Sequence, residues 1–364
     1  MKLIRTQTAD RFRRLGLTGL LSLAACTLTA VAEGPEPWVA KPAVPAAQHL
    51  FPQGAVRLLE GPFKTNQDID LAYLMRFESD RLLAQFRVEA GLEPKAKAYG
   101  GWETPAPEGK TWSLAGHTLG HYLSALSLMY RLTDDERLRE RVVYMVAELK
   151  ECQAKRGDGS LVAFPYLREL EADIKAGKVE TITKYWAPFY TIHKELGGLR
   201  DAWVMCGDAT AREVLVGLAD WCGQLVKDLS DEQREKFLDR EHGGMPEVLA
   251  DVYALTGEKR FLDYARLYSH HKVLDPLARG EDTLDGMHAN TQVPKFTGFQ
   301  RIDSSPWHPR LKGGAEHVWI RGSGEGFRLI VGLVEDVADP GLEVNDGRAI
   351  HENSAAGQAG TGGS

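Results

Sequence analysis

Histidines mark four short polar segments of this 364-residue chain, and each segment leads into a stretch with helical periodicity. The residues concerned are His121, His193, His242 and His288. A neutral imidazole donates one hydrogen bond and accepts another, so it suits a ligand that carries hydroxyl groups. The four segments therefore predict a sugar-binding site, on the condition that the fold brings them together.

The second of these segments combines its histidine with aromatic side chains. Residues 186–202 read WAPFYTIHKELGGLRDA. Pro188 suits the first turn of a helix, where its missing N–H group would have no partner, so His193 lies one turn inside that helix. Aromatic rings at the entrance, Trp186 among them, favour a sugar site. The alternative is a histidine whose hydrogen bonds are satisfied within the core.

The first segment contains a pair of histidines, His117 and His121, in the sequence GHTLGHY. Their spacing of four residues places both side chains on one face of a helix. Such a pair could bind a metal, but no third ligand lies nearby in the sequence. We therefore assign no metal ligand and expect His121 to have a structural role or to contact the edge of a substrate.

The third and fourth segments also lie at predicted helix entrances. Residues 241–247 form a Gly-rich turn with His242 and Glu247 as candidate ligand contacts, because a helix N-terminus favours an anionic or hydroxyl-rich ligand. The alternative role for Glu247 is to cap the helix. In the fourth segment, His288, Asn290 and Gln292 can donate to and accept from several sugar hydroxyls at once.

The elements that must position these residues repeat along the chain. A helix, a short turn and a second helix are predicted three times, over residues 119–153, 193–229 and 246–271. Such hairpins cannot each bury an apolar face alone, so they must stack or close into a ring. The predicted fold is all-α, a toroid of helical hairpins. Functional residues are expected at its loop-bearing end, where the inner helices begin.

The N-terminal region is predicted to direct export. Residues 1–32 combine a basic start, an apolar stretch too short to span a bilayer, and a small-residue cleavage site. The letters LAAC also match a lipoprotein box, in which Cys26 would carry the lipid. The protein is thus expected in the periplasm or as an outer-membrane lipoprotein. Residues 33–53, rich in proline and alanine, are predicted to be an extended linker.

The C-terminal region departs from the repeat. Residues 289–302 look like the first helix of a fourth hairpin, and the second helix is not found. Residues 303–364 are predicted to be an atypical tail, either disordered or out of frame, and they end in a low-complexity stretch. We therefore expect residues 54–302 to form the N-terminal part of a barrel whose C-terminal part is missing.

The net charge and the cysteine content argue against nucleic-acid binding and against a zinc site of closely spaced cysteines. The formal net charge is −7, and about −11 without residues 1–32, which hold five basic and one acidic residue. An acidic chain without a basic stripe argues against nucleic-acid binding. Apart from Cys26, the cysteines are Cys152, Cys206 and Cys222, and they lack the close spacing of a zinc site.

Four motifs in this order resemble the β-L-arabinofuranosidases of glycoside hydrolase family 127 and the related family 146. The motifs, which begin at residues 116, 186, 241 and 288, are GHTLGHYLSA, WAPFYTIHKELGGLRDA, EHGGMPEVLADVYALTGEKRFL and HANTQVPKFTGFQRI. The resemblance covers about residues 51–302 and implies an (α/α)6 barrel, here incomplete. It implies release of terminal L-arabinofuranose from plant glycans, with His193 and His288 against the sugar ring and Glu247 beside them.

The resemblance also implies a catalytic centre in which zinc, held by a glutamate and three cysteines, activates a cysteine nucleophile. The family has these residues after the region that matches HANTQVPK, and this chain has no cysteine after Cys222. We therefore assign no catalytic residue and expect no zinc to bind this chain. The alternatives are a truncated inactive pseudoenzyme, a weak sugar-binding protein, or another (α/α)6 enzyme such as an epimerase or lyase.

Overall fold

The computed structural model describes residues 38–40, 51, 54–104, 113–279, 281–303, 318–323 and 326–331. The predicted export signal, nearly all of the predicted linker, and most of the predicted tail lie outside these ranges. Among the described residues, no helix combines the length and the apolar character needed to cross a bilayer.

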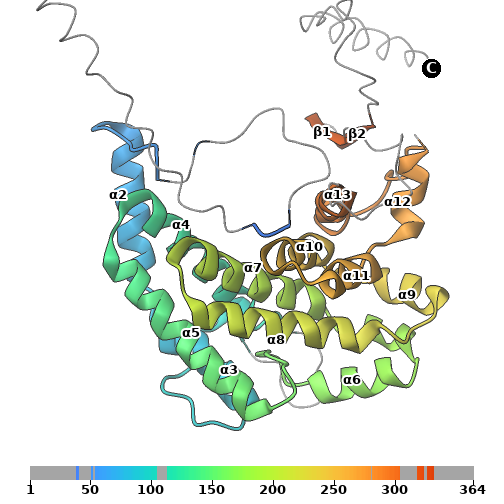
Figure 1. Cartoon of the computed structure of the whole chain (residues 1–364), viewed down its shortest axis with the longest axis horizontal. Coiled ribbons are helices and arrows are strands. Elements are labelled where there is room, and N and C mark those ends of the chain that lie inside the picture. Colours follow the sequence, from blue (N-terminus) through green and yellow to red (C-terminus); the bar gives the residue numbers. More distant parts are fainter. Residues whose placement is uncertain are drawn as a thin grey trace, which may run out of the picture.

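Helical hairpins form the body of the protein (Figure 1). The first joins α4 (His117–Thr133) to α5 (Glu136–Arg156), the second α7 (Pro188–Cys206) to α8 (Ala209–Val226), and the third α10 (Met245–Thr256) to α11 (Lys259–Leu267). All three predicted hairpins are therefore present, and the predicted all-helical fold class is confirmed for this body.

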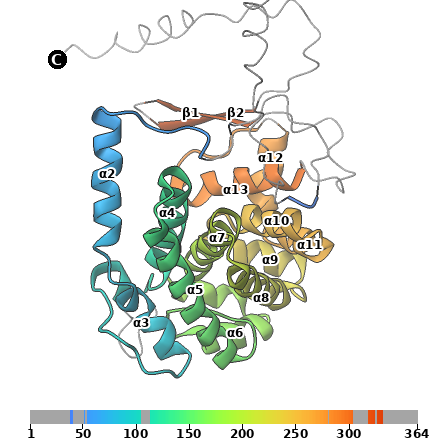
Figure 2. The same cartoon turned by 60° about the vertical axis from the view of Figure 1, so that its left-hand side comes forward.

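The hairpins stand side by side in two curved layers, as in an α/α barrel. The inner layer runs from α4 through α7 and α10 to α13 (Ala289–Asp303), and the outer layer consists of α5, α8 and α11. Figure 2 shows the inner helices next to one another. One continuous apolar core fills the space between the layers, with Leu123 from α4, Leu196 from α7 and Leu215 from α8 fully buried. This arrangement places the first turns of the inner helices at one end.

The turn inside each hairpin uses the same local chemistry. Asp134, Gly207 and Gly257 end the inner helices in the left-handed conformation. Asp135 and Asp208 then cap the outer helices, because their carboxylates accept hydrogen bonds from backbone amides of the first turn. The repeat seen in the sequence therefore corresponds to a repeat of turn geometry.

Shorter elements fill the connections and the edges. Apolar residues recur at helical spacing over residues 68–90, which predicts one helix there. The structure instead has two helices, α2 (Pro62–Met75) and α3 (Ser79–Glu89), and α2 buries no residue. The connection between α5 and α7 contains α6 (Leu167–Lys175) and the 3-10 helix η2 (Val179–Lys184). The remaining short helices are α9 (Asp231–Leu238), α12 (His271–Ala278) and the 3-10 helix η1 (Gly101–Glu103).

A two-stranded antiparallel hairpin follows α13. Strands β1 (Val318–Ser323) and β2 (Gly326–Val331) pair in the register Val318↔Val331 to Ser323↔Gly326. These strands lie in residues 303–364, which were predicted to be an atypical tail, and they were not expected.

Helices α4 and α7 approach so closely that their backbones touch. A Cβ atom on Gly120 would lie 2.2 Å from the backbone carbonyl of Lys194, and one on Gly198 would lie 2.5 Å from the carbonyl oxygen of Gly120. Real Cβ atoms do not make contacts this short with backbone. Only glycine therefore permits this spacing, which sets the distance between the first turns of the two helices.

We expect Gly120→Ala to destabilise the protein by at least about 2 kcal/mol, because the added methyl group overpacks a backbone contact. Gly197→Ala is the matched control, since Gly197 is also helical but a Cβ atom there would meet nothing within 4 Å. The control should be stabilised by about 0.5–1 kcal/mol through helix propensity. Urea unfolding of the two variants gives both values, and equal stability of the two would contradict the close approach.

Lys295 of α13 is 1% exposed, and its Nζ lies 2.7 Å from Nδ1 of His270. Burial lowers the pKa of Lys295 to about 8, against the opposing effect of the Asp239 and Glu235 carboxylates. In the unfolded chain the pKa of lysine is about 10.4. Between these two values the unfolded state binds more protons, so the free energy of unfolding should rise with pH.

We therefore expect the stability of the wild type relative to Lys295→Met to increase by about 2 kcal/mol between pH 7.5 and pH 9.5. Urea unfolding at both pH values measures this difference. A difference that stays constant over this window would show that burial does not lower the pKa of Lys295.

Candidate functional site

Helices α4, α7 and α10 line a cavity of about 230 Å³. This volume is below the roughly 300–1,000 Å³ of pockets for drug-sized ligands, so the cavity suits a group the size of one sugar ring. Its lining is polar and consists of His121, Ser124, His193, Lys194, Gly197, Arg200 and Glu247.

The turn that precedes α10 binds one nitrogen of the His193 ring. The Gly244 N–H group donates to Nδ1 of His193 at 3.2 Å. The hydrogen of the neutral ring therefore resides on Nε2, which remains a donor. Burial, followed by the nearby charges of Lys194 and Arg200, lowers the pKa of His193 well below its usual value. His193 is thus neutral at physiological pH.

The turn can reach His193 only because glycine occupies its critical position. Gly243 has φ 54°, and a Cβ atom there would lie 2.6 Å from Nδ1 of His193. The Gly-rich segment before α10 therefore has a steric role in addition to the ligand contact predicted for it.

Lys194 and Glu247 add a donor and an acceptor to the lining of the cavity. Burial lowers the pKa of Lys194, and the Glu247 and Glu241 carboxylates oppose this shift. Burial, together with the charge of Asp251, raises the pKa of Glu247. Among the described residues neither side chain has a hydrogen-bond partner, although Lys194 Nζ lies 5.2 Å above the ring of Tyr190. Both groups are therefore available to a ligand.

Arg200 forms a rigid wall of the cavity. Its guanidinium donates to Asp251 at 2.6 Å and to Asp201 at 3.0 Å, and Arg301 of α13 donates to the other oxygen of Asp251 at 2.7 Å. Burial alone would lower the pKa of Arg200, but the two carboxylates outweigh it and raise this pKa. The network joins α7, α10 and α13 beneath the cavity.

Aromatic rings cluster beside the cavity. The ring centroid of Trp102 lies 5.7 Å from that of Trp186 and 5.9 Å from that of His117, and the His117 centroid is 6.1 Å from that of Tyr190. Trp186, a predicted site residue, belongs to this cluster and does not line the cavity itself. The cluster approaches the cavity through His117, whose ring centroid lies 6.0 Å from that of His121.

The structure brings together only part of the predicted site. His121, His193 and Glu247 line one cavity. His288 and Asn290 are exposed, Gln292 is half-buried, and none of the three lines that cavity. The expectation that His193 and His288 face a common cavity is therefore not met in this structure.

His242 also requires a correction. It is 2% exposed, and its Nδ1 donates to the Arg240 carbonyl at 3.0 Å. Burial, followed by the charge of Lys295, lowers the pKa of His242 to about 3. His242, for which ligand contact was predicted, is thus buried immediately before the Gly243–Gly244 turn and does not line the cavity. Helical periodicity begins only after this residue and could not show which way its ring points.

Several residues that line the cavity were missed in the sequence analysis, although helical spacing contains the signal. Ser124 follows His121 by three residues, and Gly197 and Arg200 follow His193 by four and seven. These intervals keep side chains on one helical face. Lys194 carries no such signal. It directly follows His193 in the sequence, and adjacent residues of a helix normally point in different directions.

The described cysteines do not fit the zinc centre that the family resemblance implies. Cys152 on α5, Cys206 at the end of α7 and Cys222 on α8 are buried and unpaired. Burial raises the pKa of Cys152 to about 12 and raises that of Cys222 well above its usual value. In the described part of the chain, no three His, Cys, Asp or Glu side chains gather as metal ligands.

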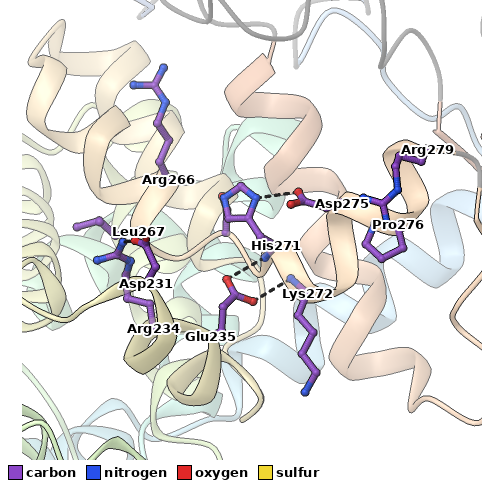
Figure 3. Close-up of a pocket in the computed structure, with 11 residues that line it drawn as sticks. Asp231, Arg234, Glu235, Arg266, Leu267, His271, Lys272, Asp275, Pro276 and Arg279 are labelled. Carbon is purple, nitrogen blue, oxygen red and sulfur yellow. Dashed lines mark hydrogen bonds and ion pairs between the residues drawn. The ribbon is translucent and has the colours of Figure 1, made fainter.

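A larger hollow of about 600 Å³ lies elsewhere, between α9, α11 and α12 (Figure 3). Its charged groups already have hydrogen-bond or ion-pair partners. Glu235 accepts from the backbone amides of His271 and Lys272, and His271 Nδ1 lies 2.9 Å from Asp275. This hollow therefore offers fewer free polar groups than the smaller cavity, which we regard as the candidate site.

Comparison with known proteins agrees with the four motifs. The profile of the family described as "Beta-L-arabinofuranosidase, GH127 catalytic domain" matches residues 55–320. No curated protein matches the chain. Among solved structures, it is similar to Ara127N-Se, a GH127 beta-L-arabinofuranosidase from Geobacillus stearothermophilus T6, with 14% identity and a TM-score of 0.41. That similarity covers 65% of this chain and 37% of the other. Because the profile spans well over half of the chain, this protein belongs to the family of the GH127 β-L-arabinofuranosidase catalytic domain.

Proposed function

We propose that the chain binds a terminal L-arabinofuranosyl group of a plant glycan in the cavity between α4, α7 and α10. The observation that carries the proposal is the set of polar groups lining this cavity. His193 Nε2–H and Lys194 can donate, the Glu247 carboxylate can accept, and the Ser124 hydroxyl can do both. Sugar hydroxyls need donors and acceptors close together, and the family membership makes arabinose the sugar to test first.

As a member of a glycoside hydrolase family, the chain is a candidate hydrolase of such arabinosides. A second candidate function is sugar binding without turnover. It is favoured by the separate positions of Cys152, Cys206 and Cys222, none of which lines the cavity. Retaining hydrolysis requires a nucleophile next to the anomeric carbon as well as an acid/base group. Glu247 is a carboxyl group in the cavity, but no described thiol accompanies it.

We further propose that the protein acts after export, in the periplasm or attached by lipid to the outer membrane. Support comes from the basic and apolar pattern of residues 1–32 and from the lipoprotein box at Cys26. A glycan from plant material is a substrate that an exported protein would meet.

We expect methyl β-L-arabinofuranoside to bind the full chain and His193→Ala to bind it roughly five- to tenfold more weakly, because the variant loses one hydrogen bond to the ligand. Titration calorimetry measures both affinities. The control variant is His271→Ala, since His271 is exposed and lies at the larger hollow. Binding that is unchanged in His193→Ala, or equally weakened in His271→Ala, would contradict the proposed site.

We expect the purified chain, supplied with zinc and a reducing agent, to release no appreciable product from an aryl β-L-arabinofuranoside. The reason is that its cysteines lie apart from one another and from the cavity, so no thiolate is placed beside the sugar. Release of the aryl group can be followed by absorbance. Turnover that depends on zinc and disappears in His193→Ala would show that the catalytic residues have been misassigned.

A further inference from the structure

An exposed tryptophan, Trp102, stands beside the proposed sugar cavity. Its side chain is 64% exposed, although tryptophan is usually mostly buried. Trp102 does not stand alone, because it joins His117, Trp186 and Tyr190 in the ring cluster described above. We call these four residues the aromatic ledge.

The position of Trp102 is fixed by its neighbour Glu103. The buried Glu103 carboxylate accepts from the backbone amides of Gly116 at 2.7 Å and Thr118 at 3.0 Å, and one oxygen lies 3.0 Å from Nδ1 of His117. Burial alone would raise the pKa of Glu103, but these hydrogen bonds outweigh it and lower the pKa. The hydrogen bonds of Glu103 thus attach the segment that carries Trp102 to the start of α4. Because this segment is already ordered, less conformational entropy would be lost when a ligand binds to the ring.

The aromatic ledge is continuous with the cavity. His117 lies between Trp102 and His121, and Tyr190 lies beneath the Lys194 ammonium group. His121 and Lys194 both line the cavity. The buried ring of His117 therefore links the cavity lining to the indole of Trp102, and this exposed indole is the surface that a ligand extending from the cavity on the α4 side would meet.

We propose that the aromatic ledge binds the second sugar ring of the substrate, the one linked to the terminal arabinofuranosyl group. The C–H groups on one face of a sugar ring are apolar and pack well against an indole, while the hydroxyl groups at the ring edge stay in water. The ledge would then select glycosides of two or more sugar units. This inference rests on the function proposed above, because it assigns the terminal sugar to the cavity.

The test is titration calorimetry of the full chain with methyl β-L-arabinofuranoside and with a disaccharide of two arabinofuranosyl units. We expect the disaccharide to bind about five- to tenfold more tightly, as expected for one aromatic contact. Trp102→Ala should abolish this gain and leave the affinity for the methyl glycoside unchanged, and Trp102→Phe should keep part of the gain. Phe63→Ala is the matched control, because Phe63 is also exposed, at 76%, and lies on α2.

The possible outcomes separate this inference from the proposed function. If the methyl glycoside binds but the disaccharide gains nothing, or if Trp102→Ala keeps the gain, the ledge is not a sugar subsite and the cavity proposal stands. If Trp102→Ala weakens both ligands equally, the ring supports the cavity structurally and the inference is wrong. If neither sugar binds the wild type, the proposed function fails and the inference fails with it.

Discussion

The contact between the backbones of α4 and α7 is the constraint on which the candidate site depends. Gly120 and Gly198 allow the two helices to meet without intervening side chains. With larger residues at these positions, α4 and α7 would have to move apart by at least the thickness of a methyl group. The cavity between His121 and His193 would then change in width. The glycines also leave fewer apolar side chains at this contact, so the surrounding leucine core must supply the stabilisation.

Burial gives the cavity its chemical character. It lowers the pKa values of His193 and Lys194 and raises that of Glu247, so each shift favours the neutral form of the side chain. Arg200 is the exception, because Asp201 and Asp251 stabilise its charge. The cavity thus combines three groups whose pKa shifts favour the neutral form with the fixed charge of Arg200.

The repeated hairpins could be predicted from the sequence because their signals are local. Apolar residues at helical spacing, Pro188 at a helix start, and the turns at Asp134 and Gly207 each act within a few residues. The break between α2 and α3 was missed, because apolar periodicity continues across Arg76 to Glu78. Periodicity reports which residues share a face, but it does not report where a helix bends.

The candidate site was less predictable, because it depends on contacts between distant segments. His121, His193 and Glu247 meet, since each lies in the first or second turn of an inner helix. His242 and His288 have similar sequence surroundings, yet one is buried against Lys295 and His270 and the other is exposed. The role of Trp102 depends on the anchor between Glu103 and α4, which no local pattern in the sequence indicates.

We propose that α4, α7 and α10 form one sugar cavity around a neutral His193. This can be measured by nitrogen NMR of the histidine side chains over a pH titration, with and without methyl β-L-arabinofuranoside. We expect His193 to titrate well below the ordinary pKa of histidine, to carry its hydrogen on Nε2 when neutral, and to shift together with His121 when the sugar is added, whereas exposed His271 does not respond. Titration of His193 near its ordinary pKa of about 6.5, with no response to the sugar, would contradict the account.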